Sequence, residues 1–205
     1  MGDPGQGPGR GGGRTPDPGR RDRIVDACLD VIAERGVAGT SHRRVAQRAG
    51  VPLGSMTYHF SGMDDLLRQA FTRFAQSVSQ RFEERMRSAH TREEALAAVV
   101  AVITDDLLGT ARDLVLTQEL YTIAAREPAY RTITNHWMSR SRAALGLHFD
   151  ADTARMLDAL IEGLSLHRAL DTEAAGTAAQ DPAMVAAAVR RITSPAPGPA
   201  GSPPR

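Results

Sequence analysis

The chain has 205 residues, of which 41% are hydrophobic and 24% are charged, and its formal net charge is +1. This composition is typical of a soluble globular protein, and a single cysteine, Cys28, excludes both a disulfide framework and a cysteine zinc site. The longest apolar run, residues 95–103, is about half of the roughly 20 residues that a membrane helix needs. No signal-peptide pattern follows Met1, so we expect a cytoplasmic protein with no membrane partner.

The charge is divided unevenly between the two parts of the chain. Residues 1–60 carry nine arginines and six acidic residues, whereas residues 61–205 carry sixteen and eighteen. There is no lysine, so every cationic side chain other than histidine is a guanidinium. The basic N-terminal part predicts a polyanionic partner for that part alone.

Both ends of the chain, residues 1–19 and 194–205, are rich in glycine and proline and are expected to be disordered. Between them the apolar residues recur with helical spacing and no strand pattern appears, which predicts an all-α fold. Pro128 divides one long segment in two, so about nine helices are expected. They cover residues 20–35, 41–48, 52–59, a long helix from 61, 91–108, 111–127, 128–147, 151–170 and 182–192.

Several residues predict where these helices begin and end. Gly36 is expected to stop the first helix in the αL conformation, and Pro52 to open the third. Ser61 and Asp64 read as a capping box before the long helix. Cys28 lies on the apolar face of the first helix, which favours a core position over redox sensing. The long helix carries one continuous apolar stripe: Leu67, Phe71, Phe74, Val78, Phe82 and Met86.

The most informative segment is residues 40–60, TSHRRVAQRAGVPLGSMTYHF. Two short helices joined at Gly50, with apolar residues spaced to hold them together (Val45, Ala46, Val51 and Met56), predict a helix-turn-helix. Gly50 supplies the backbone freedom that the sharp turn needs. Gly54 has no side chain, so the start of the second helix can approach a sugar-phosphate chain closely.

Residues 24–67 resemble the DNA-binding domain of the TetR (tetracycline repressor) family. The matching positions are Thr40, Ser41, Arg43, Val45, Ala46, Ala49, Gly50, Val51, Gly54, Met56, Phe60 and Leu66. The sequence departs from the family pattern at Arg44, Leu53, Thr57 and Met63, which removes two customary phosphate contacts. Arg43 and Arg44, with Arg20 or Arg21, are the arginines available to replace them.

The resemblance implies a DNA-binding domain over residues 20–62 and a helical effector-binding and dimerisation domain over residues 63–193. Ser41 would cap the second helix, Arg43 would reach a base edge or phosphate, and Arg48 would stay on a solvated face. Tyr58 would contact DNA, the alternative being that it packs at the domain edge. The expected DNA contacts are Ser41, His42, Arg43, Arg44, Pro52, Leu53, Gly54, Ser55, Thr57, Tyr58 and His59.

For the second domain the resemblance implies a small-molecule pocket and a homodimer. Large apolar side chains with a few polar groups suit such a pocket, and they are Phe74, Phe82, Gln118, Tyr121, Asn135, His136 and Trp137. The apolar faces expected to form the dimer contain Met156, Leu157, Leu160, Ile161, Leu164, Met184, Val185, Ala188, Val189 and Ile192. No pair of acidic residues stands out in apolar surroundings, so the sequence alone does not predict a cationic ligand.

The implied function is a bacterial, ligand-responsive repressor that leaves a palindromic double-stranded operator when an effector tilts the fourth helix. No cofactor, metal or catalytic residue is expected: the chain lacks Glu-x-x-His pairs, phosphate-binding glycine loops and a nucleophile elbow. Two alternatives stay open at this point. One is a helical module whose body binds a protein partner, and the other is an all-helical enzyme.

Overall fold

The computed structural model describes residues 17–106, 110–170 and 181–194. Within these residues the protein has nine α-helices, one π-helical turn and no strand, so the expected all-α fold is confirmed. The elements are α1 (Arg20–Arg35), α2 (His42–Ala49), α3 (Gly54–His59), α4 (Met63–Ser88), α5 (Arg92–Ala101), η1 (Val102–Asp106), α6 (Ala111–Arg126), α7 (Pro128–Leu145), α8 (Ala151–Leu170) and α9 (Pro182–Thr193). Neither the N-terminal tail before residue 17 nor the tail after residue 194 belongs to the described residues.

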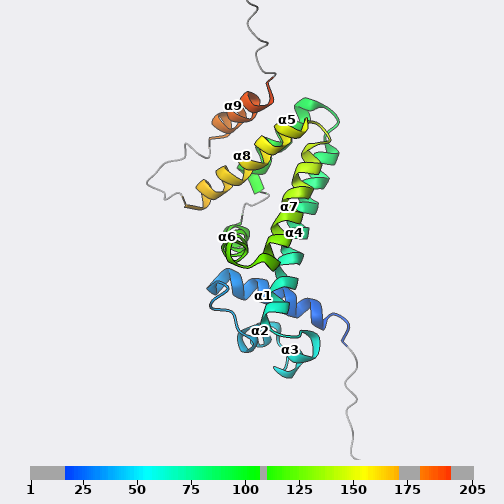
Figure 1. Cartoon of the computed structure of the whole chain (residues 1–205), viewed down its shortest axis with the longest axis vertical. Helices are drawn as coiled ribbons and strands as arrows, with labels where there is room; N and C mark the ends of the chain where they lie inside the picture. The colour runs from blue at the N-terminus through cyan, green and yellow to red at the C-terminus, as the bar shows by residue number, and fades with distance from the viewer. Residues whose placement is uncertain (1–16, 107–109, 171–180, 195–205) are drawn as a thin grey trace, which may run out of the picture.

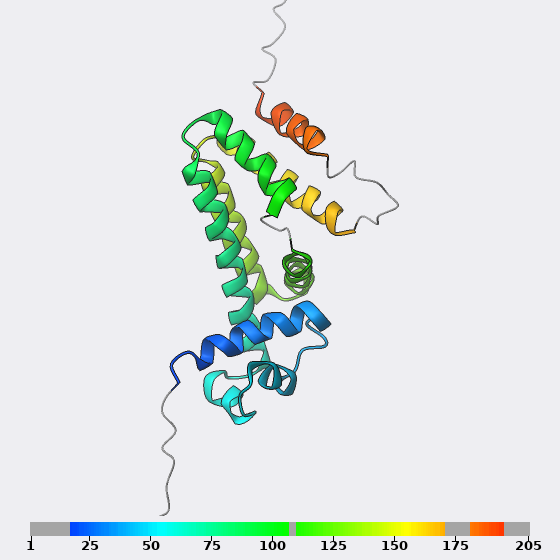
Figure 2. The same ribbon diagram turned by 180° about the vertical axis from the view of Figure 1, so that it is seen from behind.

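The helices form two parts, which we call the head (α1–α3) and the body (α4–α9). Figure 1 shows the head at one end of the molecule, with α4 rising from it beside α7 and with α8 and α9 toward the far end. Seen from behind in Figure 2, α1 crosses the lower end of α4, and α6 lies between α1 and α8. The contacts agree, because α6 packs against α1, α7 and α8. None of the described helices combines the length and the apolar character that crossing a bilayer requires.

The first helix has the predicted bounds and buries the predicted face. Ile24, Cys28 and Ile32 are fully buried and Val25 and Leu29 nearly so. Gly36 has the expected positive φ of 69°, but its ψ of 171° is extended, so the prediction of an αL stop is wrong. The extended ψ turns the next amide toward α6, where the Val37 N–H donates to the Glu119 carboxylate over 2.9 Å.

Two predicted helix starts are displaced. The third helix begins at Gly54, because Pro52 and Leu53 form the turn before it and accept hydrogen bonds from Ser55 and Met56. The long helix begins at Met63, so the predicted box of Ser61 and Asp64 does not form. Asp65 instead accepts the Ser61 N–H over 3.0 Å.

The fifth helix is shorter than predicted and changes character. Thr91 and Glu94 form a reciprocal capping box at its start, which satisfies two backbone donors. After Ala101 the backbone continues as the π-helical turn η1. Residues 107–109, the end of the predicted 91–108 helix, lie outside the described residues.

The apolar stripe of α4 is confirmed as the spine of the core. Leu67, Phe71, Phe74, Val78, Phe82 and Met86 are all at most 7% exposed. Alongside it, α7 contributes Trp137, whose ring meets Phe74 edge-on with 5.8 Å between centroids. At the rim of this contact Arg140 donates two hydrogen bonds to Glu83, of 2.5 and 2.8 Å, and this guanidinium lowers the pKa of the Glu83 carboxyl.

Cys28 is fully buried, and burial raises the pKa of its thiol to about 12. A thiol that stays protonated and shielded is a poor nucleophile. The structure therefore supports the core position over the redox-sensing alternative.

Tyr130 ties α7 to the start of α4. It is 1% exposed, and its hydroxyl donates to Asp64 Oδ1 over 2.8 Å. We expect Tyr130→Phe to lower the free energy of unfolding by about 1 kcal/mol, because a partly buried hydrogen bond to a carboxylate is lost. Urea denaturation measures this. The matched control is Tyr58→Phe, whose ring is 84% exposed and makes no hydrogen bond within the described residues; equal destabilisation by both would contradict the assignment.

Candidate nucleic-acid interface and effector pocket

The helix-turn-helix is built as the sequence predicts. Ser41 caps α2, its hydroxyl accepting the Arg44 N–H over 3.4 Å. Gly50 ends α2 in the αL conformation, with φ 64° and ψ 35°, and the following Val51 N–H bonds the Ala46 carbonyl over 3.0 Å. Val45 and Met56, both fully buried, hold α2 and α3 together.

The predicted DNA contacts lie on the outer side of α2 and α3. Leu53 is 55% exposed and Tyr58 is 84% exposed. With this exposure Tyr58 does not pack at the domain edge; among the described residues its ring contact is with His59, edge-on with 4.9 Å between centroids. The exposed members are Arg43, Arg44, Pro52, Leu53, Gly54, Thr57 and Tyr58. Partly buried are Ser41, His42, Ser55 and His59.

The arginines of the head differ in the partners that their guanidinium groups bind within the described residues. Arg43 makes no hydrogen bond or ion pair with any described residue, and Arg44 donates to the Gly39 carbonyl over 2.5 Å. Arg20 pairs with Asp17 at 3.9 Å, and Arg21 bonds Gln69 and lies over the Phe60 ring. A guanidinium that has no internal partner is the one most available to a phosphate or a guanine.

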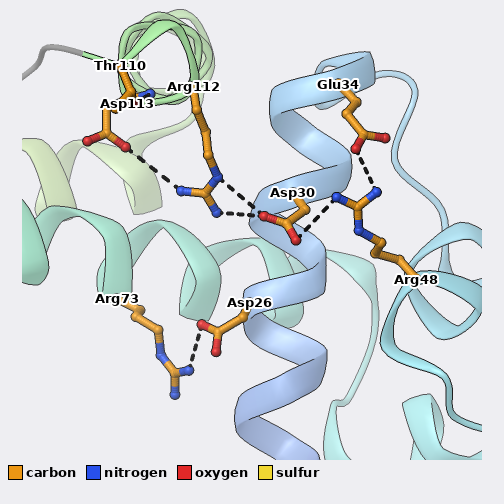
Figure 3. Close-up of polar contacts among 8 residues, drawn as sticks. All are labelled: Asp26, Asp30, Glu34, Arg48, Arg73, Thr110, Arg112 and Asp113. Carbon is orange, nitrogen blue, oxygen red and sulfur yellow. Dashed lines mark hydrogen bonds and ion pairs between the residues drawn. The ribbon is translucent and has the colours of Figure 1, made fainter.

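Arg48 takes part in a connection between the head and the body. It pairs with Glu34 at 2.6 Å and with Asp30 at 3.4 Å, and Asp30 is also bound by Arg112 of α6 at 2.9 Å. Figure 3 shows Asp30 of α1 between these two guanidinium groups, with Arg73 of α4 reaching Asp26 one turn away. Ion pairs therefore join α1 of the head to both α4 and α6 of the body.

The body contains a cavity of about 360 Å³. Its walls come from α4, η1, α6, α7 and α8: Val78, Phe82, Val102, Leu114, Thr117, Gln118, Tyr121, Trp137, Ser141, Asp158, Ala159, Ile161, Glu162, Gly163, Ser165 and Leu166. Its volume lies at the lower end of the range typical of small-molecule sites.

Four of the seven predicted pocket residues line this cavity: Phe82, Gln118, Tyr121 and Trp137. Phe74 is buried behind Trp137. Asn135 and His136 are exposed and do not line this cavity; His136 instead borders a smaller hollow of about 170 Å³ between α4 and α7. Trp137 occupies the inward face of α7, and residues one and two positions earlier are turned about 100° and 200° away from it on a helix.

The sequence reasoning missed two acidic residues of this cavity. Asp158 and Glu162 lie one turn apart on α8 and both line the cavity wall. Asp158 is 8% exposed, and burial together with nearby Glu162 raises the pKa of its carboxyl to about 6, although Arg142 donates to it over 3.2 Å. The i, i+4 spacing of two acids within an apolar helix was the available signal.

The predicted dimer residues divide into two groups. Leu157, Ile161, Val185 and Val189 are at most 9% exposed within this one chain, so the prediction that they face a second copy is wrong. They belong to the hydrophobic core that α8 and α9 share with the rest of the body. The others are partly or fully exposed: Met156, Leu160, Leu164, Met184, Ala188 and Ile192.

An exposed helix-turn-helix joined to a helical body that encloses a small-molecule cavity defines a ligand-responsive DNA-binding regulator. The comparisons identify the family. Residues 24–70 match the family described as bacterial regulatory proteins, tetR family, and residues 90–195 match the tetracyclin repressor-like C-terminal domain. The chain belongs to the TetR family of transcriptional regulators.

Individual relatives agree with this assignment. The regulator BetI of Burkholderia mallei (strain NCTC 10229) is 30% identical over 176 residues, which are 79% of this chain and 90% of BetI. SCO7518 of Streptomyces coelicolor A3(2), a candidate transcriptional regulator, is 56% identical with a TM-score of 0.76, over 87% of this chain and all of that one. The multidrug-binding protein EbrR in complex with ethidium is 33% identical with a TM-score of 0.71, over 86% and 99% of the two chains.

The comparisons do not support the two alternatives that the sequence left open, since the curated relatives are named as transcriptional regulators. No group of three or more potential ligating side chains that fits a metal ion lies among the described residues.

The raised pKa of Asp158 predicts that the stability of the protein depends on pH. Because its pKa is raised from 3.8 to about 6, the folded state binds the proton more tightly than the unfolded state. The free energy of unfolding should therefore fall as pH rises through this window, by on the order of 1–3 kcal/mol. We expect Asp158→Asn to abolish this fall in urea titrations from pH 4 to 7. Asp152→Asn, an exposed change on the same helix, should keep it, and equal profiles for the two variants would contradict the assignment.

Proposed function

We propose that this protein is a homodimeric repressor that binds a palindromic operator and leaves it when a small molecule occupies the cavity of the body. The observation that carries the proposal is that α4 and α6 each contact both the head and the cavity. A ligand in the cavity can then bias the position of the head. We further propose that the protein has no catalytic activity and needs no cofactor.

In this proposal α3 lies in the major groove, as in other helix-turn-helix proteins. Arg43, for which no described residue is a partner, reaches a guanine edge or a phosphate. Leu53 and Tyr58, both exposed apolar groups, contact thymine methyl groups and the sugar-phosphate chain. The other predicted contacts, among them the exposed Arg44, position the helix.

The dimer follows from the remaining exposed apolar groups of α8 and α9. Met156 is 47% exposed, and Leu160, Leu164 and Ile192 are partly exposed. Two copies joined by these faces present two heads, which must lie about 35 Å apart to enter successive major grooves. A symmetric dimer of this kind requires a palindromic site.

The route from cavity to head runs through α6. Leu114, Gln118 and Tyr121 of α6 line the cavity, while Arg112 and Glu119 of the same helix bind Asp30 and the Val37 amide of the head. A displacement of α6 by a ligand would therefore strain the contacts that hold the head. The helix α4, whose Val78 and Phe82 line the same cavity, is the second connection.

The likeness to EbrR supports an organic effector. EbrR has been solved with ethidium, proflavin and malachite green, all of them aromatic molecules. We propose that the cavity of this chain, whose walls include Phe82, Tyr121 and Trp137, likewise takes an aromatic small molecule.

DNA selection from a random duplex pool tests the DNA-binding part of the proposal. We expect the full chain to enrich a palindrome. On that sequence, Arg43→Ala should weaken binding by about 1–3 kcal/mol if the guanidinium reads a base. The matched control is Arg87→Ala, the same change at the far end of α4, which should leave the mobility shift unchanged. Failure to enrich any duplex at low salt would overturn the proposed function.

The proposed coupling between ligand binding in the cavity and operator binding by the head is tested at Glu119. We expect Glu119→Ala, which removes a charge-assisted hydrogen bond to the Val37 amide, to reduce the factor by which ligand weakens operator binding, by up to about tenfold. Glu119→Gln keeps an acceptor oxygen and should retain most of the coupling. Titrating ligand with and without the selected operator measures the factor. The same coupling in all three proteins would rule out this route.

A further inference from the structure

The acidic side chains of the cavity show what class of molecule it takes. The cavity wall is mainly apolar and aromatic, yet Asp158 and Glu162 both reach it from α8. Carboxylates in apolar surroundings are costly unless they are paired with a cation. The cationic partners of these two carboxylates therefore indicate the charge of the ligand.

The two carboxylates are paired differently. Asp158 receives a hydrogen bond from Arg142 over 3.2 Å. Glu162 accepts one from the hydroxyl of Tyr121 over 2.7 Å, and it forms no ion pair with any side chain that the structure describes. Burial and the neighbouring carboxylates raise the pKa of the Tyr121 hydroxyl above its ordinary value, so this group stays a neutral donor. Among the residues that the structure describes, the two carboxyl groups therefore have one guanidinium partner between them.

Aromatic faces lie beside this charge. Tyr121 and Trp137 both line the cavity, their rings tilted by 33° with 6.1 Å between centroids. Behind Trp137, the edge-on contact with Phe74 holds the indole in place. The faces of Trp and Tyr rings attract cations, most strongly where water is excluded.

We infer that the cavity binds an aromatic monocation, with Glu162 as its counter-ion and Tyr121 and Trp137 as its stacking surfaces. This inference rests on the proposed function only in taking the cavity as the effector site. It goes further by naming the charge of the ligand and the residue that selects it. A cation of this kind supplies the positive charge that no described side chain provides to Glu162.

Asp158 adds a dependence on pH. The groups that face it are Arg142 from α7, Glu162 on its own helix, and Tyr121, which α6 contributes to the same wall. Since the pKa of Asp158 is about 6, its carboxyl is mostly protonated at pH 5 and mostly ionised at pH 7.5. A ligand whose own charge does not change over this range should therefore bind more tightly as pH rises.

The test uses the full chain without DNA, with ethidium as a permanently charged aromatic cation and anilinonaphthalene sulfonate as an aromatic anion. Fluorescence titration should give tighter binding of ethidium. Glu162→Gln, which keeps the hydrogen bond from Tyr121, should weaken ethidium binding by about ten- to a hundredfold. The matched control, Glu127→Gln, is an exposed change between α6 and α7 and should leave ethidium binding unchanged.

Between pH 5 and 7.5, ethidium should bind the wild type several-fold more tightly at the higher pH, and Asp158→Asn should flatten this change. Thermal unfolding of each variant establishes that it is folded. Absence of ethidium binding, equal or tighter binding of the anion, or unchanged ethidium binding in Glu162→Gln would overturn the inference. Any of these results with operator binding intact would leave the proposed repressor function standing, so the two failures are distinguishable.

Discussion

The burial of one continuous apolar face of α4 is the constraint on which the rest of the structure depends. At its start, Leu66, Ala70 and Phe71 are fully buried where α4 packs against α1 of the head. Further along, Val78 and Phe82 of the same face line the cavity. One helix of 26 residues therefore runs from the contacts with the head to the cavity, so the packing that stabilises the body and the packing that holds the head share a single element.

The ion pairs between head and body have a different role from this packing. Arg112, Asp30 and Arg48 are each roughly a third or more exposed, and exposed ion pairs contribute little to stability. They do, however, have a fixed geometry across the junction of α1, α2 and α6. A weak contact of this kind can be broken and remade at small cost, which suits an equilibrium between two positions of the head.

The sequence predicted the head far better than the cavity, for a physical reason. The cap at Ser41, the turn at Gly50 and the buried pair of Val45 and Met56 are local features with strong residue preferences. The cavity depends on how distant helices are rotated about their axes, which no local pattern records. One error of phase on α7 placed Asn135 and His136 inside, and the apolar character of α8 on several sides hid which of its faces was inward.

Because α8 is apolar on several sides, the sequence also did not identify Asp158 and Glu162 as cavity residues, and it assigned buried residues of this helix to the dimer contact. Leu157 and Ile161 belong to the inward face of α8 together with Asp158 and Glu162, which the sequence reasoning did not separate from the outward Met156 and Leu160. By contrast, two of the departures from the family pattern have a simple structural reading. Met63, at the start of α4, packs against the core, and Leu53, before α3, projects into solvent, so neither position carries a charge.

Cys28 gives the molecule an internal reporter. It is the sole thiol of the chain, it is fully buried in the core that the head and the body share, and its high pKa keeps it unreactive. A thiol-specific reagent can therefore modify the folded protein only during transient openings that expose the inward face of α1. The rate of that modification measures how often α1 separates from its packing partners, without any engineered label.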